Sequence, residues 1–426
     1  MEFKPFPKIK NKREVYLDHA AATPLLPAVF EAMRPYFEDE FGNPGGLYKK
    51  ARNAKIQIDK ARKRIAQELG CNPRNIIFTG SGTESDNLAI KGIAKKKGSG
   101  HIITTTVEHH AVLHTCQALE KEGFEVTYLR TDEFGMVSPK QVSDALKENT
   151  ILVSVIYANN EIGTINPITD IGRAINKWKK QTGNKNLVFH TDACQAINYL
   201  EMDVKKLHVD LLTLNGSKIY GPKGIGVLYK ADHVKLKPLI DGGGQEMRMR
   251  AGTENVAGII GLAKALELAR EDFQQEAERL NKLKDYFLDQ LHKKIEKVVL
   301  NGHPTKRLPN NVNVSILDIE GEALLLYLDE YGISISTGSA CTSESLDPSH
   351  VILALGKPYE YAHGSMRFTF GRSTTKDDLD YVLDLLPDVV QRLREISPVN
   401  LKLAEDNKKP TMESAFVGDG KPKWME

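Results

Sequence analysis

The 426-residue sequence predicts an α/β fold, with a large domain built on a seven-stranded, mostly parallel sheet and a smaller α+β domain after it. Three observations predict this fold. Between residues 76 and 229, short apolar segments alternate with helical patterns, which is typical of a parallel sheet covered by helices. The turns after these segments are rich in glycine and polar residues. After about residue 295, short strands mix with helices instead.

The large domain is expected to begin with a helix at Pro27–Phe37 and a basic amphipathic helix from about Leu47 to Leu69. The seven expected strands are Ile76–Thr79, His101–Thr106, Glu125–Leu129, Ile151–Tyr157, Leu187–His190, Asp210–Leu214 and Gly226–Tyr229. The helical patterns between them are Glu84–Lys97, His110–Lys121, Ser138–Lys147 and Ile168–Thr182.

A continuous helical pattern at 254–297 leads out of the large domain. The smaller domain is expected to contain strands Val298–Leu300, Asn311–Leu317, Ile333–Ser336 and Met366–Phe370, and helices at 321–331 and 375–395. The predicted organisation is an N-terminal arm (1–14), a large domain (15–260) whose N-terminal segment packs on the small domain, linking helices (261–294), a small domain (295–398) and a disordered tail (399–426).

Composition and charge are ordinary for a soluble globular protein, with 41% hydrophobic residues, 27% charged residues and a net charge of +2. This balance does not indicate nucleic acid or an anionic membrane as a partner. The sequence contains neither an apolar run of the ~20 residues that span a membrane nor the apolar core of a secretory signal. We therefore expect a cytoplasmic protein.

The four cysteines, Cys71, Cys116, Cys194 and Cys341, are widely separated in the sequence, and no CxxC pair is present. Zinc and iron–sulfur sites usually show clustered cysteines, and disulfides are unusual in a long chain without a signal. We expect free thiols and no metal site. Cys341 is distinctive because its neighbours, in STGSACTSES, are small and polar. They indicate an exposed loop and a thiol able to reach a substrate. The alternative is an incidental loop cysteine.

The stretch LLTLNGSKIYGPKGIG at 211–226 places Lys218 at the carboxyl end of an expected strand. Ligands of open α/β sheets bind at these ends, and a lysine there can form a Schiff base with a carbonyl cofactor. The alternative is an ordinary surface lysine. Asp192 and Gln195, in FHTDACQA, end the preceding strand. A carboxylate there is what a pyridinium cofactor needs to keep its ring nitrogen protonated.

Two further turns follow strands in the same way. TGSGTESDN at 79–87 presents Ser81, Gly82 and Thr83 at a helix N-terminus, which favours anion binding or simple helix capping. VEHHAVLHTC at 107–116 places His109 where it could stack on a planar cofactor. His110 and His114 have metal-ligand spacing but no acidic third ligand nearby.

Taken together, the ordered motifs YLDHAAATP, GTESDNLAIKG, EHHAVLHTC, NNEIGTINP, TDACQA, GSKIYGPKGIG, GGGQE with RAGTEN, STGSACTSESLDPS and MRFTFGR resemble the cysteine desulfurases, within their NifS/IscS-like group. The resemblance covers about residues 15–390. It implies a fold-type I pyridoxal 5′-phosphate enzyme of the class V aminotransferase branch.

The resemblance assigns roles to individual residues. Lys218 would hold the cofactor, His109 would stack on it and move protons, and Cys341 would be the nucleophile. The remaining cofactor contacts would be Gly82, Thr83, Asn160, Asp192, Gln195, Asn215, Ser217 and, from a neighbouring subunit, Thr253. Arg367 would bind the substrate carboxylate, with Asn43 and Asn160 nearby. An arginine in an apolar strand also indicates a buried carboxylate partner, either a structural Asp or Glu or a substrate.

The implied reaction converts L-cysteine to L-alanine and leaves a persulfide on Cys341. A homodimer is implied, as are sulfur acceptors such as an iron–sulfur scaffold or a tRNA-thiolation protein. The sequence departs from the family where Asn215 and Ser217 replace a serine and a histidine, and after Asn43, where Gly45 and Gly46 replace Ser and His. The alternatives are a selenocysteine lyase, a class V aminotransferase, or a non-catalytic scaffold for iron–sulfur assembly.

Overall fold

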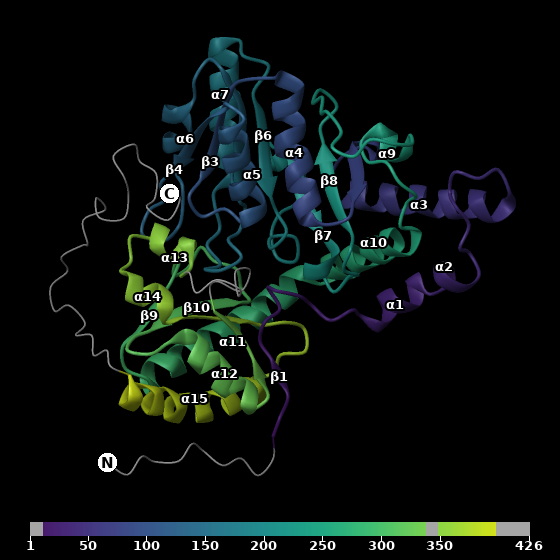
Figure 1. Cartoon of the computed structure of the whole chain (residues 1–426). Coiled ribbons are helices and arrows are strands. Elements are labelled where there is room, and N and C mark those ends of the chain that lie inside the picture. The colour runs from purple at the N-terminus through teal and green to yellow at the C-terminus, as the bar shows by residue number, and fades with distance from the viewer. Residues whose placement is uncertain (1–11, 338–347, 398–426) are drawn as a thin grey trace.

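The computed structural model describes residues 12–337 and 348–397. It confirms the predicted α/β fold, with a seven-stranded sheet in the order β2-β8-β7-β6-β5-β3-β4 (Figure 1). The strands are β2 (Ile76–Thr79), β3 (His101–Thr105), β4 (Glu125–Leu129), β5 (Thr150–Ser154), β6 (Val188–Asp192), β7 (Leu211–Asn215) and β8 (Gly226–Lys230).

Strand direction determines which turns meet. β8 runs antiparallel to both of its neighbours, β2 and β7. The pairs β6–β7, β5–β6, β3–β5 and β3–β4 are parallel. The carboxyl ends of β2, β3, β5, β6 and β7 therefore lie along one edge of the sheet.

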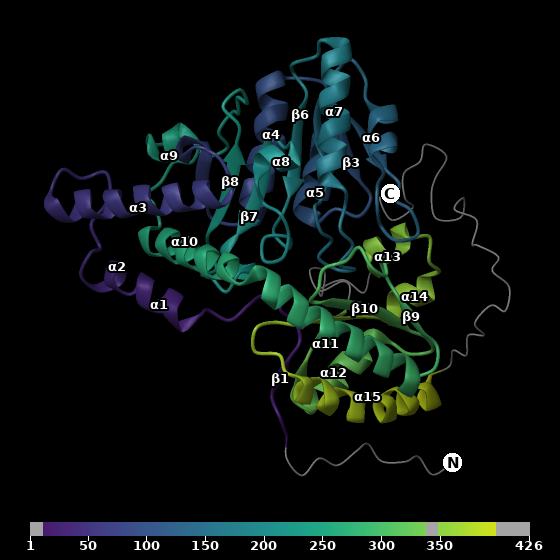
Figure 2. The same ribbon diagram turned by 180° about the vertical axis from the view of Figure 1, so that it is seen from behind.

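Each face of the sheet buries its own core because successive side chains point to opposite faces. Ile77, Ile102 and Leu152 face α4 (Gly82–Lys97) and α5 (His110–Lys121) in one cluster. Phe78, Ile103 and Val153 belong to a larger cluster on the other face. Helices also lie on both sides in the two opposite views (Figures 1 and 2). The other helices of this region are α1 (Pro27–Met33), α2 (Pro35–Glu38), α3 (Lys49–Glu68), α6 (Pro139–Ala145), α7 (Ile168–Thr182), α8 (Val204–Leu207), α9 (Gln245–Arg248) and α10 (Val256–Glu271).

A four-stranded antiparallel sheet, ordered β12-β13-β10-β9, forms the second structural unit. Its strands are β9 (Val298–Leu300), β10 (Asn311–Ile316), β12 (Ser336–Thr337) and β13 (Ser365–Thr369). Its helices are α11 (Phe273–Lys294), α12 (Gly321–Glu330), α13 (His350–Ala354), α14 (Tyr359–His363) and α15 (Lys376–Ile396). β1 (Val15–Tyr16) pairs in parallel with β11 (Ile333–Ser334), so the N-terminal segment lies on this unit.

Some expected elements are divided. The helical pattern at 254–297 forms two helices, because the chain is non-helical at Asp272. The expected strand Ile333–Ser336 contributes to two different sheets, as β11 and β12. The expected helix Pro27–Phe37 also divides before Pro35, whose ring does not tolerate a helix-interior position. Helices α13 and α14 are too short for a helical period to be recognised, and the sequence did not predict them.

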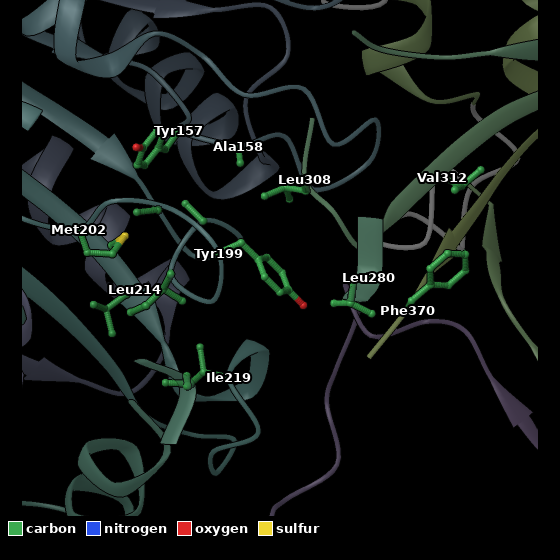
Figure 3. Close-up of a cluster of buried hydrophobic side chains, with 14 of the residues drawn as sticks. Tyr157, Ala158, Tyr199, Met202, Leu214, Ile219, Leu280, Leu308, Val312 and Phe370 are labelled. Atoms are coloured by element: carbon green, nitrogen blue, oxygen red, sulfur yellow. The ribbon is translucent and has the colours of Figure 1, made fainter. Parts of the chain in front are cut away.

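The large hydrophobic cluster continues from the large sheet into the smaller unit. Figure 3 shows Tyr199 between Leu214 and Ile219 on one side and Leu280 and Phe370 on the other. The predicted boundaries at residues 260 and 294 therefore stay a proposal. The predicted arm overlaps residues 1–11, and the predicted tail falls within 398–426; both stretches lie outside the described residues, as does Cys341. Within the described ranges, no helix is both long enough and apolar enough to cross a bilayer.

Candidate active site

Four predicted site residues collect along the carboxyl edge of the large sheet. Asp192 is the last residue of β6, and Lys218 ends the short 3-10 helix that follows β7. His109 lies between β3 and α5, and Gly82 is the first residue of α4, after β2. Because these strands end on the same edge, residues far apart in sequence are brought to one place.

The His109 ring is fixed by its own helix. Its Nδ1 atom accepts a hydrogen bond from the backbone N–H of Ala111 at 3.1 Å, so His109 caps the N-terminus of α5. Burial lowers the pKa of His109; the nearby Asp192 carboxylate opposes this shift, and Lys218 reinforces it. The ring is therefore mostly neutral at neutral pH, with its proton on Nε2, and it lies within the fields of a carboxylate and an amine.

Asp192 is 5% exposed, and its Oδ1 accepts a hydrogen bond from the backbone N–H of Cys194 at 2.9 Å. Two acids for which the sequence predicted no role lie close enough to Asp192 to feel its charge, Asp86 on α4 and Glu108 after β3. Burial and the field of Asp192 raise the pKa of Asp86 well above its usual range. Burial raises the pKa of Glu108 to about 8. Glu108 is thus largely protonated at neutral pH, and the pKa of Asp86 is shifted in the same direction.

His190 completes this buried group. Its ring lies between the hydroxyls of Ser154, at 2.9 Å, and Thr213, at 3.1 Å. Its Nε2 atom is 3.6 Å from Oδ1 of Asp86. Burial lowers the pKa of His190 to about 3, so the ring is neutral. The neutral His190 ring is thus held beside Asp86 by hydrogen bonds to two hydroxyls.

The N-terminus of α4 is closely packed against Cys194 and Asn215. Ser81 caps this helix by accepting from the backbone N–H of Glu84 at 3.1 Å. A Cβ atom at Gly82 would lie 2.9 Å from Sγ of Cys194 and 3.0 Å from Nδ2 of Asn215. Glycine therefore lets the Asn215 amide approach the helix N-terminus, where backbone N–H groups and the helix dipole favour an anion.

Ser217 and Thr83 lie next to this helix N-terminus. Oγ of Ser217 is 3.5 Å from Oδ1 of Asn215, which places the serine hydroxyl beside that amide. Thr83, the second residue of α4, is exposed. The predicted anion-binding group Gly82, Thr83, Asn215 and Ser217 is thus brought together within the described chain.

The N-terminal segment covers the lysine side of the site. Nζ of Lys218 donates to the carbonyl of Ala21, and Nε2 of Gln195 donates to that of Ala20 at 2.9 Å. The backbone N–H of Thr23 donates to the carbonyl of Ser217 at 2.9 Å. The alanines of the DHAAATP motif therefore act through their backbone, which gave no chemical signal in the sequence.

Arg367, in β13, is only 3% exposed. Its Nη2 atom is 2.8 Å from Oδ1 of Asp18, and its Nη1 atom donates to the carbonyl of Asn160 at 3.0 Å. The carboxylate partner indicated by the sequence is thus Asp18 in this structure. Asn160 meets Arg367 through its backbone carbonyl, and no role for Asp18 was predicted from the sequence.

Asn43 and Thr253 are not brought to this edge by contacts within the chain. Both are exposed, and the hydrogen bonds of Asn43 join it to Gly45 and Gly46. The loop between α2 and α3 lies at the opposite end of the molecule from α13 (Figure 1). The rings of His110 and His114 stack with centroids 4.7 Å apart. No group of three or more His, Cys, Asp or Glu residues suited to a metal occurs within 12–337 and 348–397.

Comparison with known proteins gives a consistent result. The model of the family described as Aminotransferase class-V matches residues 15–382. The chain is 51% identical over 390 residues to the cysteine desulfurase IscS of Dictyoglomus turgidum, covering 91% of this chain and 97% of that protein.

Two solved structures resemble the fold. A NifS-like protein matches with a TM-score of 0.83 and 35% identity, covering 89% of this chain and all (100%) of that one. A protein named SspA, solved in complex with cysteine, matches with a TM-score of 0.73 and 38% identity, covering 84% of this chain and 98% of that one. The chain therefore belongs to the aminotransferase class-V family and, within it, to the cysteine desulfurases of the IscS type.

Proposed function

We propose that this enzyme converts L-cysteine to L-alanine with pyridoxal 5′-phosphate as its cofactor and retains the sulfur as a persulfide on Cys341. The observation that carries the proposal is the convergence of Lys218, Asp192 and His109 at one sheet edge. A pyridoxal cofactor needs an amine, a carboxylate and a neutral imidazole that lie near one another.

The residues present fit this cofactor. Lys218 would hold its aldehyde carbon covalently, Asp192 would face its ring nitrogen, and His109 would stack on the ring. Gln195 would contact the ring hydroxyl. The crowded N-terminus of α4 would take the phosphate, through Gly82, Thr83, Asn215 and Ser217. When bound, the cofactor accepts the electron pair that is left at the substrate Cα when its proton is removed.

The protein's own groups then perform the binding and proton transfers. Arg367 binds the substrate α-carboxylate, with Asn160 beside it. Nζ of Lys218 removes the α-proton, and His109 assists proton movement. The Cys341 thiolate attacks the substrate Sγ, and the Cβ–Sγ bond breaks. Its electron pair stays on the carbon side and takes up a proton. One cysteine and one enzyme thiol thus become one alanine and one enzyme persulfide.

Chain continuity supports the role of Cys341. Before residue 338, Ser336 is paired with Arg367 and Thr337 with Met366. After residue 347, Ser349 hydrogen bonds to Glu161, the neighbour of Asn160. The described residues on either side of the stretch that contains Cys341 therefore pair with Arg367 and with the neighbour of Asn160, the two residues proposed to hold the substrate.

The test is product release. The purified enzyme with pyridoxal 5′-phosphate is expected to release sulfide and alanine from L-cysteine in the presence of a reductant, with a change in cofactor absorbance. Cys341→Ala should keep the absorbance change and lose sulfide release. Lys218→Ala should lose borohydride-reducible, covalently attached cofactor. Equal sulfide release by Cys341→Ala and the wild type would refute the persulfide role.

The same assays separate the alternatives. A selenocysteine lyase would act on L-selenocysteine and release no sulfide from L-cysteine, and a class V aminotransferase would require a keto acid and no thiol. A non-catalytic scaffold would change neither substrate. Persulfidated enzyme would then be used to identify the acceptor, an iron–sulfur scaffold or a tRNA-thiolation protein, by sulfur transfer in vitro.

We also propose that the enzyme is a homodimer in which Thr253 reaches the partner's phosphate site. Exposed apolar side chains on α1, on α2 and in the loop between α2 and α3 support a subunit contact there: Phe30, Phe37, Phe41, Leu47 and Tyr48. Light scattering should give twice the chain mass. Mixing Lys218→Ala with Thr253→Ala subunits should restore part of the activity, because one of the two sites in a mixed dimer is then intact.

A further inference from the structure

Helix α13 (His350–Ala354) sits on the two loops that carry His109 and Asn160. A separate apolar cluster joins them: Val107 from the loop after β3, Ile162 from the loop after β5, and Val351, Ile352 and Leu355 from α13 and its end. The helix is only five residues long, so its position depends on these contacts and not on its own helical stability.

Two hydrogen bonds fix the first turn of α13. Oγ of Ser349 donates to Oε2 of Glu161 at 2.5 Å, and Nε2 of His350 donates to the carbonyl of Glu108 at 3.0 Å. Ser349 also caps the helix by accepting from the backbone N–H of Ile352 at 3.2 Å. Ser349 is 2% exposed and Glu161 5% exposed, so water does not compete for their bond.

Glu161 connects this turn to the substrate side of the site. Its backbone N–H donates to Oδ1 of Asn159 at 2.9 Å. Its carbonyl accepts from the side-chain amides of Asn311, at 3.0 Å, and Asn313, at 3.1 Å, both on β10. The carbonyl of the preceding residue, Asn160, accepts from Arg367. Glu161 thus joins α13, β10 and the loop that contacts Arg367.

A carboxylate is not needed for packing at this position, because the apolar cluster alone would bury α13 against the loops. Burying one is costly unless it is hydrogen-bonded or paired with a charge. Ser349 and the field of Arg367 offset only part of this cost for Glu161, because burial still raises its pKa to about 7. The remaining desolvation cost of the Glu161 carboxyl group indicates a geometric role that an apolar residue would not perform.

We propose that Glu161 is a positioning residue for sulfur transfer. With Ser349, it anchors α13 on the loops of His109 and Asn160 and so fixes, beside the substrate site, the residues that follow the stretch containing Cys341. The inference depends on the proposed function, because it assigns the persulfide step to Cys341. Cofactor loading and substrate affinity do not depend on the anchor.

The experiment compares matched variants of the holoenzyme. Ser349→Ala and Glu161→Ala remove the bond from either side, whereas Ser349→Thr and Glu161→Gln keep a donor and an acceptor. Ser138→Ala is the control, because Ser138 caps α6 in the same manner and is exposed. We measure kcat and KM for sulfide release, L-cysteine affinity from the cofactor absorbance, and hydrogen exchange of the α13 amides.

Ser349→Ala and Glu161→Ala are expected to lower kcat about tenfold or more, since small misplacements of reacting groups have effects of this size. KM and L-cysteine affinity should stay within about twofold, and α13 amides should exchange faster. Ser349→Thr and Glu161→Gln should recover kcat, and Ser138→Ala should leave it unchanged.

The proposal is overturned if the two alanine variants keep wild-type kcat, or if they change kcat and KM together with loss of cofactor. It is also overturned if they lower kcat no more than Ser138→Ala does. Failure of the proposed function is separate: the wild type would then release no sulfide, whereas hydrogen exchange would still test the anchor.

Discussion

Nη2 of Arg367 lies 2.8 Å from Oδ1 of Asp18, so the arginine proposed to bind substrate is already paired with a carboxylate of the N-terminal segment. The Arg367 side chain is 4% exposed and that of Asp18 17% exposed. A buried guanidinium with one carboxylate partner and one carbonyl partner has a fixed orientation before substrate arrives. The pair joins the N-terminal segment, β13 and the loop of Asn160 at one point.

Arg367→Lys is expected to raise KM for L-cysteine about tenfold to a hundredfold, with cofactor loading unchanged. Lysine keeps the charge but loses the planar fork that orients a carboxylate. Steady-state kinetics with cofactor absorbance measure both quantities. Arg372→Lys is the control, because Arg372 forms a comparable pair with Asp272 at 2.7 Å outside the proposed site. Equal effects of the two substitutions would contradict the substrate role.

The buried imidazole of His350 makes the free energy of unfolding depend on pH. Burial lowers the pKa of His350 to about 3, against an ordinary value near 6.5. Below pH 6.5 the unfolded chain binds a proton that the folded protein does not, so this group reduces the free energy of unfolding as pH falls from about 6.5 toward 3. Its slope is at most about 1.4 kcal/mol per pH unit.

The measurement is urea unfolding of the wild type and His350→Gln between pH 5 and 7.5. The variant should lose less stability than the wild type on acidification. Parallel pH curves for the two proteins would show that His350 is protonated equally in both states.

Glu161 makes the free energy of unfolding depend on pH in the opposite direction. Burial raises its pKa to about 7, with Ser349 and Arg367 opposing the shift. The folded protein therefore holds a proton that the unfolded chain releases above about pH 4.5. The free energy of unfolding contributed by this group decreases as pH rises toward 7 and is constant above it. Glu161→Gln should gain stability relative to wild type over this range, by up to about 3 kcal/mol. A difference between the two proteins that does not vary with pH would contradict this.

Phe287, on α11, packs edge-on against two rings of β13 and its end. Its centroid is 5.1 Å from that of Phe368 and 5.6 Å from that of Phe370, and it is fully buried. Phe287→Ala should lower the free energy of unfolding by about 3–5 kcal/mol through the cavity it leaves. Leu326→Ala, at a side chain 65% exposed, should change it by less than about 0.5 kcal/mol. Denaturant unfolding measures both, and similar losses would contradict the assigned core.

Secondary structure was predictable wherever the pattern was long and local. The expected strands Ile76–Thr79 and Glu125–Leu129 and the expected helices His110–Lys121 and Ile168–Thr182 have the same bounds in the structure. The division of the 254–297 pattern at Asp272 was not predictable, because good helix formers stand on both sides of it. Helix α13 was also missed, since five residues carry no helical period.

The sequence by itself determined that Lys218, Asp192 and His109 would stand near one another, because residues that follow parallel strands share an edge of the sheet whatever surrounds them. Only the tertiary structure decided their supporting contacts. Arg367 meets Asp18 across 349 positions of the chain, and Ser349 meets Glu161 across 188. Such pairs leave no local pattern, because each depends on how the N-terminal segment, α13 and the second sheet pack against the large sheet.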